Sequence, residues 1–473
     1  MRITDVGVAA PLESTVSRPR PGDDLPPIAD VARRAVAEVF GPIGERSFAV
    51  RYWTGATDPC PAGTTPRFTL IVRHAGALRR MFWPPSELGV AEAFIRGDVD
   101  VEGDLEGAVA VGRQMAARFG SPGRIARLAA LLLRLPAHAP EDAVRPRAAI
   151  GRPEWFGTNG FGIGSRHRPS RDAAAVRHHY DVGNEFYRLW LDERQVYSCA
   201  YFNHADVSLD AAQWAKLDLV CRKLRLRPGE RLLDVGCGWG ALICHAAQHY
   251  GVTAIGITLS PAQAVLARQR IRQCGVDDRC HVELLDYRSI ATLGAFDKIA
   301  SVGMVEHVGA ARLPTYFDAL FRALRPGGLL LNHGIVSLLR ARPATAGQRL
   351  RRWMWRSGAF MDRYIFPDGE LVTVGETARQ AEAAGFEVRD VENLRPHYTL
   401  TLRQWLRRLD ARRAEAVALV GAARYRAWRL YLAGSAQAFD SGWLGIIQTL
   451  ATRPAPDGGS ALPLTRHDLY CPA

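Results

Sequence analysis

The sequence predicts an α/β fold, in which a doubly wound, mostly parallel sheet is preceded by a smaller α+β N-terminal domain. From about residue 173, short apolar runs alternate with segments of helical periodicity, the pattern of a parallel sheet covered on both faces. Before that point, strand-like and helical segments form a separate group. A stretch rich in Pro, Gly, Arg and His divides the two groups, which indicates two domains.

Changes in composition divide the 473 residues into five segments. Residues 1–27 are Pro-rich, polar and without periodicity, so we expect disorder there. An N-terminal accessory domain at 28–135, a linker or mobile cover at 136–172, the main domain at 173–453 and a C-terminal tail at 454–473 follow. Within the accessory domain, periodicity predicts helices and strands: the helices are Ile28–Val39, Glu87–Phe94 and Gly107–Phe119, and the strands are Ser47–Trp53 and Phe68–His74.

The main domain contains five predicted strands, and helices follow several of them. We expect right-handed connections between the parallel strands. The predicted strands are Arg231–Val235, Thr253–Leu259, Cys280–Leu285, Phe296–Val302 and Gly328–Gly334, and the helices are Ala241–His249, Pro261–Cys274 and Leu313–Leu324.

The formal net charge of +13 indicates an anionic partner, and charge alone leaves nucleic acid, an anionic membrane surface and an acidic substrate open. The eight cysteines form no C-x-x-C pair and no zinc-site spacing, so we expect free thiols and no metal site. Free thiols and the lack of an apolar leader favour the cytoplasm. No apolar run reaches the roughly 18–20 residues of a spanning helix, so membrane contact would be peripheral.

A glycine-rich loop follows the first predicted strand of the main domain. Asp234 precedes Gly236, Gly238 and Gly240 in the run LLDVGCGWG. Ligands of open parallel sheets bind beyond the C-terminal ends of the strands, and glycines let the backbone turn tightly and approach a ligand. The G-x-G-x-G spacing differs from the dinucleotide fingerprint. It suits a nucleoside with an amino-acid tail, whose ammonium Asp234 can face.

Residues at the ends of two later strands are further candidates for binding the ligand. Thr258 and Gln263 follow the second strand, at a position where an acidic residue often holds a ribose. Tyr287 and Arg288 follow the third strand, where an adenine is usually contacted. Ser260 equally fits the N-cap of the next helix, and both interpretations can hold together.

Several longer motifs resemble one family. They are HHYDVGNEFY at 178–187, YSCAYF at 197–202, GITLS at 256–260, SVGMVEHVG at 301–309, YIFPDG at 364–369, and WRLYLAGS at 428–435 with a later glutamine, Gln448. These motifs, in this order over residues 173–450, resemble those of the cyclopropane-fatty-acyl-phospholipid synthases and the related mycolic acid cyclopropane synthases. Residues 89–105 resemble, less specifically, the N-terminal domain of the longer phospholipid-acting members. Threonine at position 258 is usual in this family.

The resemblance implies a Rossmann-like class I methyltransferase fold and an activity. The enzyme would transfer a methylene carbon from S-adenosyl-L-methionine to a cis double bond of phospholipid acyl chains. A carbocation would form, and a bound bicarbonate would take its proton as the cyclopropane ring closes. The implied catalytic residues are Cys199, Glu306, His333, Tyr398 and Ile335. The implied cofactor-binding residues are Tyr197, Ser198, Asp234, Gly236, Cys237, Gly238, Trp239, Gly240, Thr258, Gln263, Tyr287 and Arg288.

The implied catalytic residues each have a structural alternative. Cys199 could be a small buried apolar residue, and Glu306 a surface carboxylate near a helix start. His333 could be a satisfied core histidine. His397 is a rival ligand to the tyrosine beside it, and we interpret His307 as structural.

The expected partners follow from charge and from the resemblance. Residues 348–366 (QRLRRWMWRSGAFMDRYIF) interleave arginines with aromatic residues. This suits an anionic bilayer, although single-stranded nucleic acid or an ordinary amphipathic helix would fit as well. Residues 403–413 are interpreted as a helix packed on the core with a solvated basic face. The resemblance favours unsaturated phospholipid acyl chains and an anionic membrane surface as partners, with no nucleic acid. The protein would work at the inner leaflet, and its N-terminal domain would form a homodimer or dock the enzyme to lipid.

Three other functions remain as alternatives. The same carbocation can yield a methyl- or methylene-branched product of the tuberculostearic type. The chain could also methylate another small molecule or a nucleic acid. A catalytically inactive module that binds membrane and cofactor is the third, and the complete set of Cys, Glu, His and Tyr argues against it.

Overall fold

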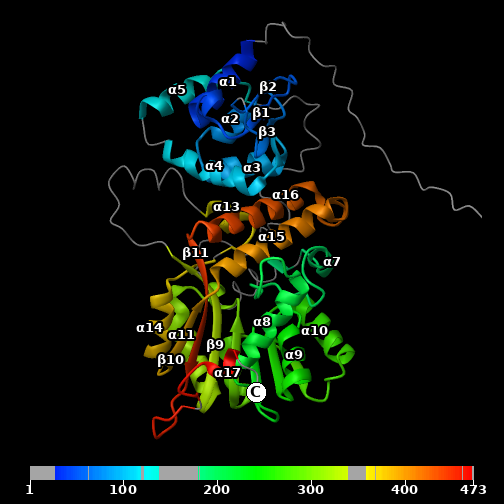
Figure 1. The fold of residues 1–473 in the computed structure, drawn as a ribbon, viewed down its shortest axis with the longest axis vertical. Coiled ribbons are helices and arrows are strands. Elements are labelled where there is room, and N and C mark those ends of the chain that lie inside the picture. The colour runs from blue at the N-terminus through cyan, green and yellow to red at the C-terminus, as the bar shows by residue number, and fades with distance from the viewer. Residues whose placement is uncertain are drawn as a thin grey trace, which may run out of the picture. The chain divides into compact units, whose positions relative to one another are not determined.

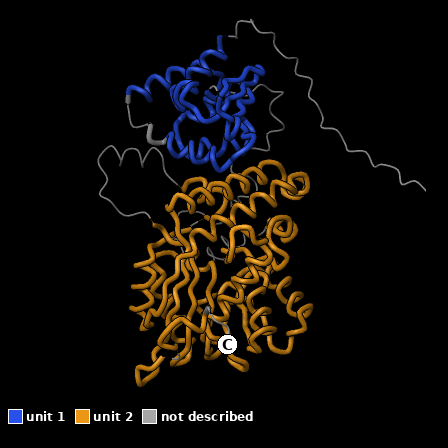
Figure 2. The backbone as a smooth tube through the Cα atoms, in the orientation of Figure 1, with its two compact units in different colours: residues 1–145 blue, residues 146–473 orange. Residues whose placement is uncertain are grey.

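The computed structural model describes residues 27–61, 63–118, 122–137, 179–180, 182–338, 358–367, 369–460 and 462–470. The chain forms two compact units, residues 1–145 and 146–473 (Figure 2). The segments expected to be disordered (1–27) and to form a linker (136–172) lie almost entirely outside the described residues. The predicted fold class is confirmed, because a mostly parallel sheet with flanking helices accompanies a smaller α+β unit (Figure 1).

The first unit contains a four-stranded sheet in the order β2-β1-β3-β4. Strands β1 and β3 are parallel, whereas β2 and β4 pair antiparallel at the edges. Every second residue of β3 is buried, as expected for a sheet with one face on a core. The elements are α1 Pro27–Phe40, η1 Ile43–Glu45, β1 Ala49–Arg51, β2 Thr57–Asp58, β3 Phe68–Val72, α2 Ala77–Phe82, α3 Glu87–Arg96, β4 Val99–Gly103, α4 Leu105–Arg118 and α5 Pro122–Leu133.

The second unit contains a seven-stranded sheet in the order β10-β11-β9-β8-β5-β6-β7. The neighbouring pairs from β9 to β7 are parallel, and β10 and β11 add an antiparallel edge. The strands are β5 Arg231–Val235, β6 Thr253–Thr258, β7 Cys280–Leu284, β8 Phe296–Val302, β9 Leu324–Ser337, β10 Glu387–Asn393 and β11 Leu444–Thr452. The α-helices are α7 Asn184–Arg188, α8 Leu209–Lys223, α9 Ala241–Tyr250, α10 Pro261–Gln273, α11 Leu313–Ala323, α13 Ala359–Tyr364, α14 Val374–Ala383, α15 Arg395–Ala411, α16 Arg413–Asp440 and α17 His467–Tyr470; the 3₁₀ turns are η3 Tyr287–Leu293, η4 Val305–His307 and η5 Ala310–Arg312.

Adjacent buried residues of the central strands β5 and β9 pack in two different cores. Leu232 packs with α8, α9 and α10 on one face, whereas its neighbour Leu233 packs with α11 and α14 on the other. The adjacent pair Leu330 and Leu331 of β9 is divided in the same way. Because side chains of a strand alternate between faces, a continuous apolar run is what a sheet covered on both sides requires.

The structure extends the predicted sheet in two places. Strand β9 begins at Leu324 and ends at Ser337, so it is longer than the predicted Gly328–Gly334. Strands β10 and β11 were not predicted, and β11 lies antiparallel to β9 over its full length. Helix α17 contacts α8, and Asp468 of α17 pairs at 2.9 Å with Arg225, which follows α8. These contacts anchor part of the segment expected to be a tail.

The structure also bears on the expected state of the cysteines and on the expectation that no helix spans a membrane. The seven cysteines within the described part of the chain are free thiols, and Cys471 lies outside it. None of the described helices is long and apolar enough to cross a membrane.

Candidate active site

The glycine loop after β5 has the geometry that its sequence predicts. Gly236, Gly238 and Gly240 have φ values of 82°, 54° and 81°, the left-handed region that favours glycine. The amides of Gly236 and Cys237 both donate to the Ile257 carbonyl of β6, at 3.0 and 2.9 Å. The loop is therefore fixed to the neighbouring strand before α9 begins.

A cleft opens beyond the ends of β5, β6 and β8. Ten of the twelve residues predicted to bind the cofactor line it: Tyr197, Ser198, Asp234, Gly236, Cys237, Gly238, Trp239, Thr258, Gln263 and Tyr287. The other two are not part of the lining. Gly240 faces helix α10, where an added Cβ would lie 3.1 Å from the Ala267 Cβ. Arg288 pairs with Asp286 at 2.9 Å and lies over the Tyr287 ring, so it supports the cleft from outside.

Thr258 and Gln263 form a neutral pair where an acidic residue is common. The Thr258 hydroxyl donates to Gln263 Oε1 at 2.8 Å. The Ser260 hydroxyl accepts from the Gln263 amide at 3.3 Å, so it caps α10 as the sequence also suggested. Both interpretations of this strand end therefore hold, because the cap positions a side chain that lines the cleft.

A buried lysine beneath the cleft was missed by sequence reasoning. Lys216 of α8 donates to the Ser198 hydroxyl at 3.1 Å, and burial lowers its pKa to about 8. Burial also raises the pKa of Asp234 to about 7, an effect that the charge of Lys216 opposes. Helical spacing places Lys216 on the buried face of α8 together with Gln213 and Leu217, and this was the available signal.

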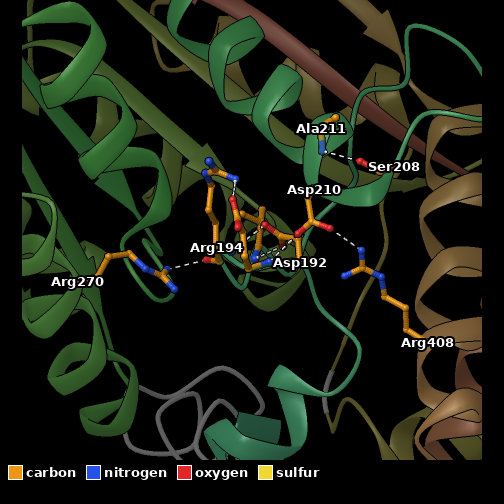
Figure 3. Close-up of polar contacts among 9 residues, drawn as sticks. Asp192, Arg194, Ser208, Asp210, Ala211, Arg270 and Arg408 are labelled. Carbon is orange, nitrogen blue, oxygen red and sulfur yellow. Dashed lines mark hydrogen bonds and ion pairs between the residues drawn. The ribbon is translucent and has the colours of Figure 1, made fainter. Parts of the chain in front are cut away.

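Polar contacts hold the segment between α7 and α8, which carries several site residues (Figure 3). Asp192 accepts from the Arg194 amide at 3.0 Å, and Arg270 donates to the Arg194 carbonyl at 2.6 Å. Arg408 of α15 binds Asp210 at 2.5 Å. Asp210 of α8 also accepts from the Glu193 amide at 2.8 Å, and Arg408 donates to the Leu191 carbonyl at 2.9 Å, so α8, α10 and α15 all contact this segment.

Glu306 and Ile335 are joined by a hydrogen bond. The Ile335 amide of β9 donates to Glu306 Oε1 at 2.7 Å. The second oxygen, Oε2, is buried with no partner among the described residues. Burial raises the pKa of Glu306 to about 7, so the carboxyl can carry a proton near neutrality. It is therefore not the ordinary surface carboxylate of the structural alternative.

His333 lies fully buried in β9, directly opposite Gln448 of β11. Its Nδ1 atom is 3.1 Å from Gln448 Nε2, whereas its Nε2 atom is buried without a partner in the described ranges. Burial, reinforced by the charges of Lys216 and Lys223, lowers the pKa of His333 to about 3. The imidazole is neutral, and one of its nitrogens is available for a ligand.

Cys199 and Tyr398 are buried close to one another. Burial raises the pKa of the Cys199 thiol far above its usual range, so the sulfur is a neutral thiol. The pKa of Tyr398 is raised by burial and then by the nearby Tyr431, Cys199 and Glu306, which places these groups within electrostatic range of its hydroxyl. The rival His397 is engaged elsewhere, because it accepts the Phe202 amide at 3.0 Å.

Aromatic side chains enclose this end of the cleft. The hydroxyls of Tyr197 and Tyr431 are 3.0 Å apart, and the Phe366 ring stacks on His179 with centroids 4.2 Å apart. Burial raises the pKa of Tyr180 to about 12, and Glu306 adds to this shift. No role had been assigned to these tyrosines except Tyr197, although they lie in motifs that carry the family resemblance.

His307, which we interpreted as structural, lines the cleft. The segment 348–366, interpreted as a bilayer contact, lies partly outside the described residues. Its described end, α13 and the residues after it, buries Phe360, Tyr364 and Ile365 instead of presenting them to solvent.

Residues 167–449, more than half of the chain, match the family described as mycolic acid cyclopropane synthetase. The chain belongs to the mycolic acid cyclopropane synthetase family. A probable fatty acid methyltransferase of Pseudomonas putida is 39% identical over 422 residues, which are 89% of this chain and 95% of that protein. A probable fatty acid methyltransferase of Mycobacterium tuberculosis is 36% identical over 436 residues, 91% of this chain and 96% of that one.

A solved structure gives the fold relationship within the mycolic acid cyclopropane synthetase family. The mycolic acid cyclopropane synthase CmaA1, crystallised in complex with SAH and CTAB, shares 36% identity with this chain and a TM-score of 0.55. The matched region covers 59% of this chain and 98% of the CmaA1 chain. The two fatty acid methyltransferases cover about nine tenths of this chain, so their likeness extends into its N-terminal unit.

Proposed function

We propose that this protein binds S-adenosylmethionine in the cleft and transfers a methylene carbon to a cis double bond of phospholipid acyl chains, forming a cyclopropane ring. The observation that carries the proposal is the pair of buried atoms without partners among the described residues, Glu306 Oε2 and His333 Nε2, beside the cleft that follows the glycine loop. Membership of the mycolic acid cyclopropane synthetase family and the crystal complex of CmaA1 with SAH support the cofactor.

The cofactor would lie along the glycine loop. Thr258 and Gln263 present neutral polar groups suited to ribose hydroxyls, and Tyr287 offers a ring for the adenine. Asp234 lies buried at the loop's start with Oδ1 unpartnered within the described chain, where it can face a ligand ammonium. These contacts would hold the sulfonium in line with the double bond, which a weakly nucleophilic alkene requires.

The reaction makes and breaks few bonds. The alkene π electrons form a bond to the methyl carbon, the carbon–sulfur bond breaks, and a cation remains on the other alkene carbon. Loss of one proton from the transferred methyl then supplies the electron pair that closes the ring. Tyr197, Tyr431, Trp428 and Phe366 supply aromatic walls that favour a cation and keep water away.

The residues that flank the cation fit an oxyanion such as bicarbonate. When bound, bicarbonate would supply the base for the departing proton. His333 Nε2 and Glu306 Oε2 would hold it, together with the Cys199 thiol and the Tyr398 hydroxyl. The Ile335 amide, also expected as a ligand, would act through Glu306, because it already donates to that carboxylate.

A second product has an observation in its favour. The two relatives that cover about nine tenths of the chain are named as probable fatty acid methyltransferases, not as cyclopropane synthases. The same cation that closes a ring can instead yield a methyl- or methylene-branched chain. We therefore keep a branched fatty acyl product as the alternative within the same site and cofactor.

An anionic membrane surface at the inner leaflet is the proposed partner. Residues 403–429 of helices α15 and α16 contain eight arginines and two acidic residues. Figure 1 shows these helices side by side across one end of the sheet. Within α16, the apolar tip 417–423 contains the kink at Gly421 and leaves Leu419 51% exposed. The helix from this tip to Tyr431 rises about 14 Å, a short path from a lipid surface to the site.

The membrane surface can be tested separately from the chemistry. We expect Leu419→Glu to weaken sedimentation with vesicles that contain anionic phospholipid, because a charge in the tip opposes insertion. Val265→Glu on α10 is the matched control, since Val265 is 66% exposed outside this surface. Equal binding by both variants would rule out the tip as the contact. The N-terminal unit, proposed to dock lipid or to form a homodimer, can be followed in the same assay and by light scattering.

The activity itself is tested with purified protein, S-adenosylmethionine and vesicles of cis-unsaturated phospholipid. Proton NMR of the recovered acyl chains distinguishes the products, since cyclopropane protons resonate far upfield of vinylic ones. A cyclopropane supports the main proposal, and a methylene or methyl branch supports the alternative. Unchanged acyl chains, with methylation of RNA or of a small molecule, would overturn both.

A further inference from the structure

A chain of polar side chains leads away from His333 behind the cleft. Gln448 of β11 pairs directly across from His333 of β9, and its Nε2 lies 3.1 Å from His333 Nδ1. At the other end of the same amide, Lys223 of α8 lies with Nζ 2.7 Å from Gln448 Oε1. Lys223 also contacts the Glu392 carboxylate of β10. Side chains of β11, α8 and β10 thus form a chain of contacts that begins at His333 of β9.

The lysine determines which way the glutamine amide points. An ammonium has donors and no acceptor, so Gln448 must turn its carbonyl oxygen toward Lys223. Its NH₂ group then faces His333 and donates to Nδ1. A nitrogen that accepts a hydrogen bond carries no proton, and a neutral imidazole then holds its proton on Nε2. That Nε2 atom is the one left without a partner among the described residues.

We propose that Lys223 and Gln448 are positioning residues that lock His333 in its Nε2–H tautomer, so that it presents a donor to an anion in the site. The identification of the anion as the base rests on the proposed function, whereas the assignment of the tautomer does not. With the opposite tautomer, a lone pair would face the anion and repel it. Glu392 completes the chain, because it supplies a counter-charge to an ammonium whose side chain is only 2% exposed.

The same arrangement opposes protonation of His333. An imidazolium would carry a hydrogen on Nδ1 that points at the glutamine NH₂ group, and Lys216 and Lys223 add positive charge nearby. The low pKa of His333, about 3, agrees with this geometry. His333 therefore keeps a single donor in the site over the physiological pH range.

The tautomer can be measured by NMR on the full-length protein labelled with ¹³C and ¹⁵N in histidine, without substrate or cofactor. The His333 signals are assigned among the 13 histidines by their loss in His333→Asn. We expect the ring shifts of the Nε2–H tautomer in the unmodified protein. Lys223→Met frees the amide to flip, so the Nδ1–H tautomer should become populated. Lys298→Met is the matched control, because Lys298 is a buried lysine of β8 with its own acidic partner, Glu230.

Gln448→Glu provides an independent variant of almost the same shape. A carboxylate facing Nδ1 should draw a proton onto that nitrogen and raise the pKa of His333, while Lys223 keeps a partner. Turnover should fall about 10–100-fold, the loss usual when a group that orients a ligand histidine is removed, with affinity for S-adenosylmethionine unchanged. An Nδ1–H tautomer in the unmodified protein would overturn the proposal. An Nε2–H tautomer that neither variant alters would overturn it as well. The expected tautomer in a protein that modifies no lipid would instead count against the proposed function alone.

Discussion

Glu306 and Ile335 meet through a 2.7 Å hydrogen bond that uses one carboxylate oxygen and leaves the other buried without a partner in the described structure. The bond links η4, which follows β8, to the adjacent strand β9. It orients the second oxygen, and it lowers the pKa of the carboxyl by less than burial raises it. The Ile335 amide therefore fixes the orientation of a carboxyl whose second oxygen we propose to bind a ligand.

Glu306→Gln keeps an oxygen for the Ile335 amide and removes the ionisable carboxyl. We expect turnover to fall by about 10² or more, as for the loss of a group that acts in proton transfer. Affinity for S-adenosylmethionine, measured by calorimetry, should be unchanged, because the cleft lining lacks this side chain. Lost cofactor binding would show that Glu306 supports the cofactor site instead.

Glu306 should also make stability depend on pH. Its pKa rises from 4.5 to about 7 on folding because of burial, so folding favours the protonated form. Its contribution is fully present below about pH 4.5 and is lost as the pH rises through about 7. Urea unfolding at several pH values should show the unmodified protein losing stability over this window relative to Glu306→Gln. The comparison cancels Asp234, whose pKa is also raised to about 7. A constant difference between the two proteins would contradict the assignment.

Gly256 of β6 lies under the cofactor loop with no room for a side chain. An added Cβ would lie 2.7 Å from the Cβ and Sγ atoms of Cys237. Gly256→Ala should cost about 1–3 kcal/mol of stability, the usual effect of overpacking, and should weaken binding of S-adenosylmethionine by displacing the loop. Gly112→Ala on α4 is the control, because its Cβ meets nothing within 4 Å. Unchanged cofactor affinity in Gly256→Ala would show that the loop tolerates the shift.

Cys199 should be chemically inert in the folded protein. Its thiol is fully buried and burial raises its pKa, whereas Cys274 is partly exposed. Because the thiolate is the reactive form, iodoacetamide should alkylate Cys274 well before Cys199. Mass spectrometry of the peptides checks the order, and guanidinium should abolish the difference. Rapid labelling of native Cys199 would point to a thiolate that acts as a nucleophile.

Local sequence features predicted the central sheet and most of the cofactor cleft. Gly236, Gly238 and Asp234 could be placed because a glycine loop after a parallel strand needs only its own residues to define its geometry. The parallel strands were recognisable from short apolar runs. The resemblance to one family then brought Glu306, which lies far away in sequence, to the same edge of the sheet.

Long-range packing accounts for what the sequence left out. Strands β10 and β11 add to the sheet antiparallel, so the partner of His333 lies 115 residues away at Gln448. Helical spacing can place Lys216 on the buried face of α8, but only tertiary packing shows which groups Lys216 and Lys223 contact. Periodicity marks the buried face of a helix, but it does not identify the strand that this face meets.

The fate of the transferred methyl hydrogens tests whether this site deprotonates a methylated cation. The protein is supplied with S-adenosylmethionine that carries a trideuterated methyl group and with vesicles of cis-unsaturated phospholipid. We expect a cyclopropane that keeps two deuterium atoms on the new carbon, because one is removed as the ring closes. An acyl chain that keeps all three, or no modified acyl chain at all, would contradict the proposal that this site deprotonates a methylated cation.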